Sequence, residues 1–325
     1  MGCGVQVRRL GVSGLAVSVV GVGCNNFGGR VGPEATAAVV HAALDCGVTL
    51  FDTADIYGHP HGSSESLLGD ALAGHRDQVV LATKVGKPMD GINGPDWDAR
   101  GSRRYVRTAV EASLRRLGTD RIDLLQMHEP DPRTPIEETL AALDDLVRAG
   151  KVLALGSSQF AGWQVTEAQW AARSLGTSRF VSTQSKYSLI DRAAEAELVP
   201  ACLAAGVGLL PFFPLEFGLL TGKYRRGQGA PDGTRLARDG YDEVLRRAPW
   251  DTLEALEAFA AQRGRSLLDL AVTGLLARPA VASVIAGATT PDQVRANVAA
   301  AGWEPTTEDL ADLDRLTAAP DQDRR

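Results

Sequence analysis

The chain has 325 residues, of which 44% are hydrophobic and 23% are charged, as is usual for a globular protein. Its 34 basic and 40 acidic residues give a formal net charge of −6, which argues against nucleic acid as a partner. No stretch approaches the ~18 consecutive apolar residues of a membrane span, and the N-terminal residues lack the apolar core of a signal peptide. The cysteines have no metal-binding spacing, so we expect reduced thiols, no metal and a cytoplasmic location; they are Cys3, Cys24, Cys46 and Cys202.

Apolar runs alternate with helical stretches along nearly the whole chain. The runs are short, rich in Val, Ile and Leu, and lack polar alternation, as expected of parallel strands that are buried on both faces. We predict strands at Val17–Gly23, Val48–Thr53, Val79–Val85, Ile122–His128, Val152–Ser157, Phe180–Ser185, Val207–Phe213 and Ala282–Gly287. Helical periodicity between them predicts helices at Pro33–Cys46, Ser64–Ala73, Ser102–Leu117, Pro135–Ala149, Trp163–Leu175, Arg192–Ala205, Thr252–Arg263 and Pro291–Ala300.

Eight strand–helix repeats favour an α/β fold of the (β/α)8 TIM barrel type, with residues 1–325 forming one domain. In an open doubly wound sheet, a Gly-x-Gly-x-x-Gly turn would be expected after the first strand. The segment Gly21-Val-Gly-Cys-Asn-Asn-Phe-Gly28 has only the first half of that pattern. The barrel is therefore the preferred architecture.

Four segments lie outside the repeat. Gln6–Ser18 is expected to form an N-terminal β-hairpin that closes the barrel bottom, with Gly11 and Gly14 at turn positions. Ser266–Ala277 and Thr307–Thr317 are expected to be additional helices. Leu215–Trp250 is a long insertion, which in a compact fold usually covers a ligand or is disordered.

Residues able to carry charge or move a proton end three successive predicted strands. Asp52, Lys84 and His128 close strands two, three and four, and Tyr57 follows Asp52 on the next loop. The C-terminal ends of barrel strands form the rim where barrel enzymes place their active sites. Each residue alone is explained as well by a loop cap, a solvated amine or packing. Four titratable types at neighbouring strand ends have no packing explanation, so we predict an active site.

The chemistry of these side chains indicates their roles. The pKa of a Tyr hydroxyl is ordinarily about 10, and the Lys84 ammonium is expected to lower it for Tyr57. Asp52 would keep Lys84 charged and oriented, and His128 would bind a substrate oxygen. Without a Ser or Cys nucleophile, the set is poorly suited to acyl transfer. It suits carbonyl reduction, in which a cofactor must supply the hydride.

The remaining strand ends offer groups that suit such a cofactor. Gly156-Ser157-Ser158 and Gln184 provide hydroxyl and amide groups for a carboxamide, and Phe212 provides a flat ring for stacking. Gly218–Lys223 could wrap a pyrophosphate, and Ile285–Asn297 runs from strand eight into a helix N-terminus, which attracts anions. Each of these segments could instead be an ordinary loop, and the two serines a plain helix cap.

The chain resembles the aldo-keto reductases from about Val7 to Leu316. The resemblance implies a barrel that binds NADPH in extended form across its C-terminal rim, without metal. It implies that Tyr57 is the general acid, Lys84 lowers its pKa, Asp52 pairs with Lys84 and His128 orients the carbonyl. The motifs that carry it are Phe51-Asp-Thr-Ala-x-x-Tyr57 with Gly58 and Glu65, Thr83-Lys84, Leu117-Gly-Thr-Asp-x-Ile-Asp-Leu-Leu125, His128, and Gly150-Lys-Val152 with Gly156-x-Ser158.

The resemblance also implies which residues contact the cofactor. Its members usually have Ser-Asn where this chain has Ser157-Ser158, and commonly Tyr where Phe212 would stack. From the resemblance we expect NADP(H). Members selective for NADPH often have Lys or Arg where Gly287 and Gln293 stand, so NAD(H) stays the alternative. The expected cofactor residues are Gly23, Cys24, Ser157, Ser158, Gln184, Phe212, Leu215, Gly218, Leu220, Lys223, Gly287, Thr289, Gln293 and Asn297.

The expected partner is a small carbonyl or alcohol substrate, with sugars among the candidates. Two alternatives stay open. Potassium-channel β-subunits, which resemble this family, keep the cofactor but act mainly as binding partners, and a barrel lyase or isomerase could use the same acid and base without redox chemistry. The sequence leaves the oligomeric state open. The expected substrate-pocket residues are Asn26, Phe27, His59, Trp97 and Phe213.

Overall fold

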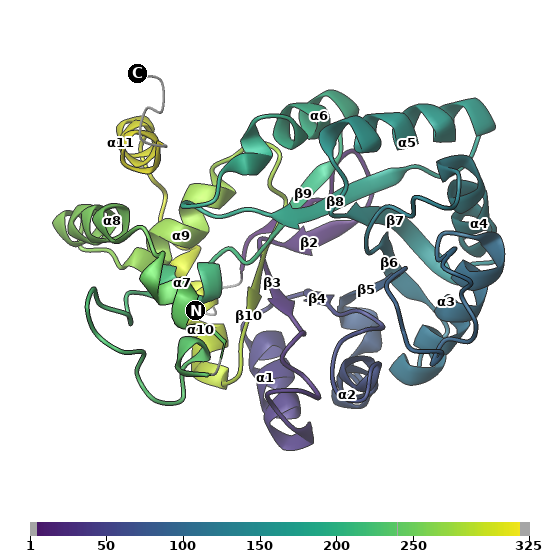
Figure 1. The fold of residues 1–325 in the computed structure, drawn as a ribbon, viewed down its shortest axis with the longest axis horizontal. Coiled ribbons are helices and arrows are strands. Elements are labelled where there is room, and N and C mark those ends of the chain that lie inside the picture. The colour runs from purple at the N-terminus through teal and green to yellow at the C-terminus, as the bar shows by residue number, and fades with distance from the viewer. Residues whose placement is uncertain (1–4, 239, 319–325) are drawn as a thin grey trace.

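Eight parallel strands form a barrel with helices around it, seen end-on in Figure 1. The structure is a computed structural model that describes residues 5–238 and 240–318, so Cys3 and both ends of the predicted domain lie outside it. Neighbouring strands follow one another in chain order from β3 to β9, and β10 pairs with β3. The strands are β3 (Val20–Gly23), β4 (Leu50–Asp52), β5 (Val80–Val85), β6 (Ile122–Met127), β7 (Val152–Ser158), β8 (Phe180–Lys186), β9 (Gly208–Phe212) and β10 (Val284–Gly287).

The ring closes between β9 and the residues that precede β10. The Leu209 amide donates to the Ala280 carbonyl at 2.7 Å, and the Ala282 amide donates to the Leu209 carbonyl at 3.0 Å. This closure and the parallel order confirm the predicted (β/α)8 barrel. Among the described residues, no helix is long and apolar enough to cross a membrane.

Alternation along the strands explains how the barrel positions polar groups. Leu50, Ala82 and Leu124 belong to one cluster of buried apolar side chains inside the lower barrel. Side chains two residues further along a strand point to the same face. Asp52 and Lys84 therefore continue the inward rows at the C-terminal ends of β4 and β5, above this apolar layer.

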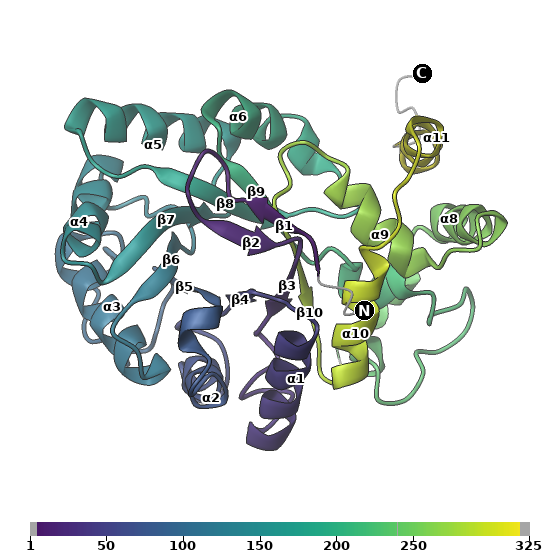
Figure 2. The same cartoon turned by 180° about the vertical axis from the view of Figure 1, so that it is seen from behind.

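The N-terminal hairpin is present at the opposite end of the barrel, where Figure 2 shows it from behind. Its strands are β1 (Val7–Arg9) and β2 (Ala16–Ser18), and Leu10 and Val17 complete the apolar cluster inside the barrel. The first predicted strand, Val17–Gly23, is in fact divided between two strands, because the chain bends at Val19. The Ser18 hydroxyl donates to the Val20 carbonyl at 2.7 Å and accepts from the Thr49 amide at 3.0 Å.

The predicted helices are present, with two corrections. The helix predicted at Arg192–Ala205 is a 3₁₀ turn, η2 (Ala193–Glu195), followed by a shorter α6, because Glu197 leaves the helical region with φ −134°. The helices are α1 (Pro33–Asp45), α2 (Ser63–Ala71), α3 (Arg103–Leu117), α4 (Ile136–Arg148), α5 (Gly162–Leu175), α6 (Leu198–Ala205), α7 (Asp242–Arg246), α8 (Trp250–Gln262), α9 (Leu267–Leu276), α10 (Pro291–Ala300) and α11 (Thr307–Thr317).

The second correction concerns which helix follows β9 in the ring. We predicted that Thr252–Arg263 would be the barrel helix and Ser266–Ala277 the extra one, but α9 packs against α10 and β10 while α8 lies outside α9 with α11 (Figure 1). The reason is hydrophobicity, since α9 is buried on most of its surface whereas α8 presents a narrower apolar face. α8, α9 and α11 share their own apolar cluster.

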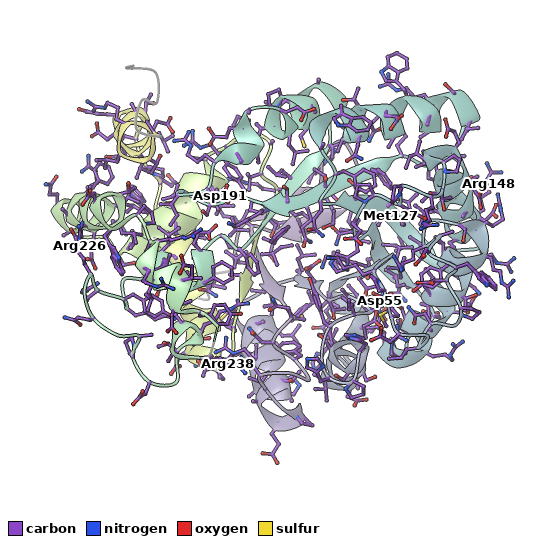
Figure 3. The ribbon with its side chains drawn as sticks, in the orientation of Figure 1. Asp55, Met127, Arg148, Asp191, Arg226 and Arg238 are labelled. Carbon is purple, nitrogen blue, oxygen red and sulfur yellow. The ribbon has the colours of Figure 1, made fainter. Side chains whose placement is uncertain are left out.

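In its described residues, the long segment after β9 forms local secondary structure. It contains the 3₁₀ turns η3 (Glu216–Thr221) and η4 (Arg235–Ala237) and the short helix α7. Arg226 and Arg238, labelled in Figure 3, lie on this segment, on the side of the barrel where α7 and α8 are found. Thr234 and Arg235 of this segment line the same cleft as Asp52 and Tyr57 at the strand ends, as expected of an insertion beside a ligand site.

Candidate active site

A buried ion pair lies at the C-terminal ends of β4 and β5. Lys84 Nζ lies 2.7 Å from Asp52 Oδ2 and donates a second hydrogen bond to the Thr53 carbonyl at 2.9 Å. The side chain of Lys84 is 0% exposed and that of Asp52 is 4% exposed. Burial acts to lower the pKa of Lys84, but the Asp52 carboxylate and the Tyr57 phenol outweigh it and raise the pKa. The ammonium therefore stays charged.

Two glutamine amides hold the other oxygen of Asp52. Gln126 Nε2 on β6 donates to Asp52 Oδ1 at 3.0 Å, and Gln184 Nε2 on β8 donates to the same atom at 2.9 Å. Gln184 Nε2 also lies 3.4 Å from Gln126 Oε1. Both carboxylate oxygens thus have donors, which a buried charge requires. Sequence analysis missed Gln126, although it stands two residues after the inward Leu124.

Tyr57 reaches this pair from the loop after β4. Its Oη lies 3.5 Å from Lys84 Nζ, and its amide donates to the Ala54 carbonyl at 3.1 Å, which fixes the loop. Burial raises the pKa of the Tyr57 phenol by more than the Lys84 ammonium lowers it. Lys84 does lower the pKa of Tyr57, as expected, but the cost of desolvating the phenolate is larger and the net shift is upward. The phenol keeps its proton at neutral pH.

His128 stands next to Tyr57 after β6. The two rings meet edge to face, with centroids 5.8 Å apart, and His128 Nδ1 is buried without a hydrogen-bond partner among the described residues. Burial, with the Lys84 and Lys87 ammoniums nearby, lowers the pKa of His128 well below its ordinary value. The imidazole is therefore neutral at neutral pH and can exchange a hydrogen bond with a carbonyl oxygen.

Asp52, Tyr57 and His128 line a cleft of about 710 Å³ at the rim, while Lys84 is fully buried behind them. The cleft gathers side chains from both ends of the chain, which the barrel topology brings together. Many predicted site residues line it besides the catalytic candidates Asp52, Tyr57 and His128. They are Gly23, Cys24, Asn26, Ser158, Gln184, Phe212, Phe213, Leu215, Gly218, Lys223, Gly287, Thr289, Gln293 and Asn297.

Three expected substrate residues lie elsewhere. Phe27 is 0% exposed and packs into the main apolar core, because its turn directs the ring between α1 and the barrel. Trp97 is 61% exposed, and its ring is covered by the Arg104 guanidinium, 4.1 Å from the ring centroid. His59 lines a separate groove next to the cleft. The positions of these residues along their loops did not indicate where their side chains point.

Two expected cofactor residues are also turned away from the cleft. Ser157 is fully buried, and its hydroxyl donates to Thr183 Oγ1 at 3.0 Å. Leu220 is buried in the apolar cluster of α8, α9 and α11. After β7 the cleft is lined instead by Ser158 and Gln159, and Gln159 has a left-handed backbone with φ 59°. Strand alternation from Ser158 would have excluded Ser157.

Sequence analysis also missed several polar and aromatic residues of the cleft wall. Most of them lie on loops after β3, β5 and β9, where no periodicity fixes the direction of a side chain. The only signal in the sequence was their position just beyond a strand end. They are Asn25, Arg30, Lys87, Gln159, Glu216, Phe217 and Arg235.

The loop after β9 has a strained backbone and is anchored by an ion pair and by cation–π contacts. Phe213, Glu216 and Phe217 have left-handed backbones, with φ of 53°, 42° and 55°. Glu216 Oε1 lies 3.1 Å from Lys186 Nζ, and burial raises the pKa of this carboxyl group. Arg235 lies over the Phe213 and Phe217 rings, 5.3 and 5.1 Å from their centroids. Such strain persists where the surroundings determine the conformation, often at functional sites.

The groups along the cleft fit a nicotinamide dinucleotide. Both N–H groups of the Gln184 amide are used within the protein, which leaves its oxygen as an acceptor for a carboxamide. Phe212 offers an exposed ring face. Lys223 has no carboxylate partner among the described residues, and burial together with Arg30 lowers its pKa. Lys223 packs on Gly218, where a Cβ would stand 2.9 Å from Lys223 Cε, so the glycine makes room for the lysine at the cleft wall.

Comparisons with known proteins agree with this geometry. The model of the Aldo/keto reductase family matches residues 19–318. An uncharacterized oxidoreductase, YrpG, of Bacillus subtilis is 37% identical over 302 residues, covering 91% of each chain. The L-glyceraldehyde 3-phosphate reductase of Escherichia coli K12 is 34% identical over 97% of this chain and 93% of its own. A probable voltage-gated potassium channel subunit beta of Arabidopsis thaliana is 34% identical over 91% of each.

The buried neutral state of His128 predicts a pH dependence of stability. In the unfolded chain this histidine titrates near its ordinary pKa of about 6.5. Because the folded pKa lies well below that, the unfolded state binds a proton that the folded state does not, and stability falls as pH drops below about 6.5. In His128→Asn, the free energy of unfolding should fall less between pH 6.5 and 5 in urea titrations. The control is His41→Asn, which changes an exposed histidine of α1. If the free energy of unfolding changes equally with pH in the native chain, His128→Asn and His41→Asn, the prediction is contradicted.

The two glutamine bonds predict that Gln126 supports both folding and turnover. Gln126→Met removes one donor to Asp52 and should lower the free energy of unfolding by ~1–3 kcal/mol. It should also lower the turnover number, because Asp52 then holds Lys84 less firmly. Gln169→Met is the matched control, since Gln169 is a buried amide that bonds the Phe180 carbonyl at 2.7 Å outside the cleft. It should destabilise the protein without slowing turnover; an equal effect on turnover would refute a role for Gln126 in the site.

Proposed function

This chain belongs to the aldo/keto reductase family, and we propose that it reduces aldehydes or ketones to alcohols, or catalyses the reverse oxidation, with NADP(H). The observation that carries the proposal is the buried Lys84–Asp52 pair with the Tyr57 hydroxyl 3.5 Å from Lys84 Nζ. An acid, a fixed cation and a neutral imidazole meet there at one wall of a cleft. This arrangement suits proton transfer to a carbonyl oxygen.

In reduction, Tyr57 donates its hydroxyl proton to the carbonyl oxygen. Burial raises the pKa of the phenol, so the acid is present at neutral pH. The phenolate that forms lies beside the Lys84 ammonium, whose positive charge stabilises it. Asp52, held by both glutamines, keeps that ammonium charged and fixed. His128 orients the carbonyl oxygen by a hydrogen bond from its neutral ring.

A nicotinamide cofactor supplies the hydride when bound. Ser158, Gln159 and Gln184 would hold its carboxamide, Phe212 would stack on the ring, and Lys223 would meet the pyrophosphate. At the adenosine end the cleft is lined by Gly287, Thr289, Gln293, Ala296 and Asn297, none of them cationic. This lining supports use of NAD(H) beside NADP(H), because a 2′-phosphate is usually met by Arg or Lys.

A small carbonyl compound or alcohol is the proposed partner. One relative is named for the reduction of L-glyceraldehyde 3-phosphate, a small aldehyde, which supports that size class. We also propose a cytoplasmic location, supported by the free thiols of Cys24, Cys46 and Cys202.

A role as a binding subunit is the second candidate, because one relative is described as a probable potassium channel subunit beta. The intact proton-transfer group favours the reductase, since a binding role does not need it. Fluorescence titration with NADPH and NADH, followed by an aldehyde and ketone panel, separates the two. Tight cofactor binding with turnover supports the reductase, and tight binding without turnover supports the binding subunit.

Replacing the general acid tests the mechanism directly. Tyr57→Phe should lower turnover by ~10²–10⁴ while the Kd for the cofactor stays nearly the same. The control Tyr105→Phe removes the hydroxyl of a buried tyrosine on α3 and should leave turnover unchanged. Unchanged turnover in Tyr57→Phe would remove this residue from the mechanism.

Introducing a cation tests the assignment of the adenosine end. Gln293→Arg should tighten NADPH relative to NADH by roughly tenfold or more, as expected of a hydrogen bond to a charged group. In the native chain, Gln293 Oε1 instead accepts from the Thr289 amide at 2.8 Å. Gln293→Met separates loss of this bond from gain of the cation, because only the Arg variant should favour NADPH. Equal ratios in both variants would place the adenosine end elsewhere.

A further inference from the structure

Arg116 on α3 holds a buried carboxylate next to the strand that carries Lys84. Its Nε lies 2.7 Å from Glu65 Oε2, and the Glu65 side chain is 0% exposed. Glu65 belongs to the first turn of α2, and its other oxygen accepts a hydrogen bond from the Thr83 hydroxyl at 2.6 Å. Thr83 immediately precedes Lys84 on β5. One chain of contacts therefore runs from Arg116 to the neighbour of the active-site lysine.

A second chain of contacts runs from the same guanidinium to the loop of Tyr57. Arg116 Nη1 donates to Asn93 Oδ1 at 3.1 Å, and Asn93 Nδ2 donates to Asp55 Oδ2 at 2.8 Å. The Asp55 amide donates to the Lys84 carbonyl at 3.1 Å. Asp55, labelled in Figure 3, stands two residues before Tyr57 in the sequence. This chain of contacts therefore ties the tyrosine loop to the strand of the lysine.

The network joins two buried carboxyl groups through one cation. Asp55 and Glu65 are both 0% exposed, and Asp55 Oδ1 has no hydrogen-bond partner among the described residues. Burial and the Glu65 carboxylate raise the pKa of Asp55, and the Arg116 guanidinium acts to lower it. Neighbouring acids inside a protein repel each other unless a cation lies between them. Arg116 supplies that cation, because its N–H groups reach Glu65 directly and Asp55 through Asn93.

Arg116 itself stands outside the cleft. It lines the separate groove of about 490 Å³ that His59 also lines, and its side chain is 16% exposed there. A Cβ added to Gly62 would stand 2.5 Å from Arg116 Cδ, so the turn before α2 packs closely on this side chain. Arg116 therefore touches neither the proposed acid nor the groups suited to the cofactor, and it can act on them only through its partners.

A similar ion pair holds the other end of β5. Arg76 Nη1 lies 2.7 Å from Asp123 Oδ2, and the same oxygen accepts from the Leu81 amide at 2.9 Å. The side chains of Arg76 and Asp123 are 18% and 9% exposed, close to the values for Arg116 and Glu65. Arg76 and Asp123 are absent from the lining of the cleft. The two pairs thus match in chemistry and burial, and they differ in which end of the strand they hold.

The proposed reaction requires the Tyr57 hydroxyl and the Lys84 ammonium at a fixed separation. Their atoms lie 3.5 Å apart, at the outer limit of a hydrogen bond, so this contact alone does not fix it. On the basis of the reductase function proposed above, we propose that Arg116 is a positioning residue. Through Asn93 and Glu65 it fixes the Tyr57 loop relative to the Lys84 end of β5. It should therefore affect turnover and leave cofactor affinity unchanged.

Arg116→Gln and Arg76→Gln test the proposal as a matched pair. Each removes the cation from a buried carboxylate, so both should lower the midpoint of urea unfolding. At a temperature where circular dichroism shows every variant folded, Arg116→Gln should lower kcat by roughly ten- to a hundredfold, as a small misplacement of reacting groups does. The Kd for NADPH, measured by fluorescence, should stay nearly the same. Arg76→Gln should leave kcat unchanged. Equal losses of kcat in the two variants, or no loss in Arg116→Gln, overturn the proposal.

Arg116→Lys and Arg76→Lys keep the comparison available if a Gln variant does not fold. A lysine can pair with Glu65 but lacks the planar fork that reaches Asn93 at the same time. Arg116→Lys should therefore lower kcat, by less than Arg116→Gln does, and Arg76→Lys should not. If both Lys variants turn over at the native rate, the contact through Asn93 has no role and the proposal is overturned.

The Tyr57→Phe background separates positioning from a general loss of structure. A residue that acts through the acid has less to position once the acid is gone, so Arg116→Gln should lower kcat by a much smaller factor there than in the native background. The same factor in both backgrounds overturns the proposal.

Absence of turnover with every aldehyde and ketone overturns the proposed function, and hydrogen exchange then judges the positioning. Arg116→Gln should speed amide exchange in residues 53–57 and 83–85, because both segments lose a restraint, and should leave 79–81 unchanged. Arg76→Gln should show the reverse. Exchange at 53–57 that is unchanged in Arg116→Gln, or equally faster in both variants, overturns the positioning role.

Discussion

The active site depends on keeping one lysine charged inside the barrel. A buried ammonium ordinarily loses its proton, because an apolar interior disfavours charge. Lys84 keeps it because Asp52 Oδ2 lies 2.7 Å away and the Thr53 carbonyl accepts a second bond. Asp52 is then itself a buried charge, so its other oxygen, Oδ1, must also accept hydrogen bonds. Gln126 and Gln184 meet that need from β6 and β8. Four strands are thus tied together by one charge.

Burial and this charge together set the protonation states around it. Burial, with the Lys84 and Lys87 ammoniums adding to it, keeps His128 neutral. The same ammonium favours the Tyr57 phenolate, yet burial still holds the phenol protonated. The site therefore contains one permanent cation, one neutral base and one acid that releases its proton only to a strong acceptor. Such separation of roles follows from burial as much as from the identity of the residues.

Strand periodicity made the fold and the positions of the proposed catalytic residues predictable, and its absence in the loops explains the failures. Asp52 and Lys84 sit on the inward rows that Leu50 and Ala82 begin, so alternation alone places them in the barrel. The same rule places the Gln126 side chain inside the barrel, but an amide gave no chemical reason to include this residue in the site. Loop residues such as Trp97 have no period, and their directions are set by contacts that form only in the folded chain. The exchange of α8 and α9 has a different cause: α9 is apolar around most of its surface and joins the ring, whereas α8 has a narrower apolar face and lies outside it.

Under the proposed function, the amide of Gln184 links cofactor recognition to catalysis. Its two N–H groups are fixed by Asp52 Oδ1 and Gln126 Oε1, so its oxygen can point in only one direction. A group bound by that oxygen is therefore positioned by the same carboxylate that fixes Lys84, and through it the Tyr57 hydroxyl. Displacing Asp52 would move the cation, the acid and the carboxamide acceptor together. In the proposed reaction, one carboxylate thus fixes the proton donor and the hydride donor relative to each other, as hydride and proton transfer to one carbonyl requires.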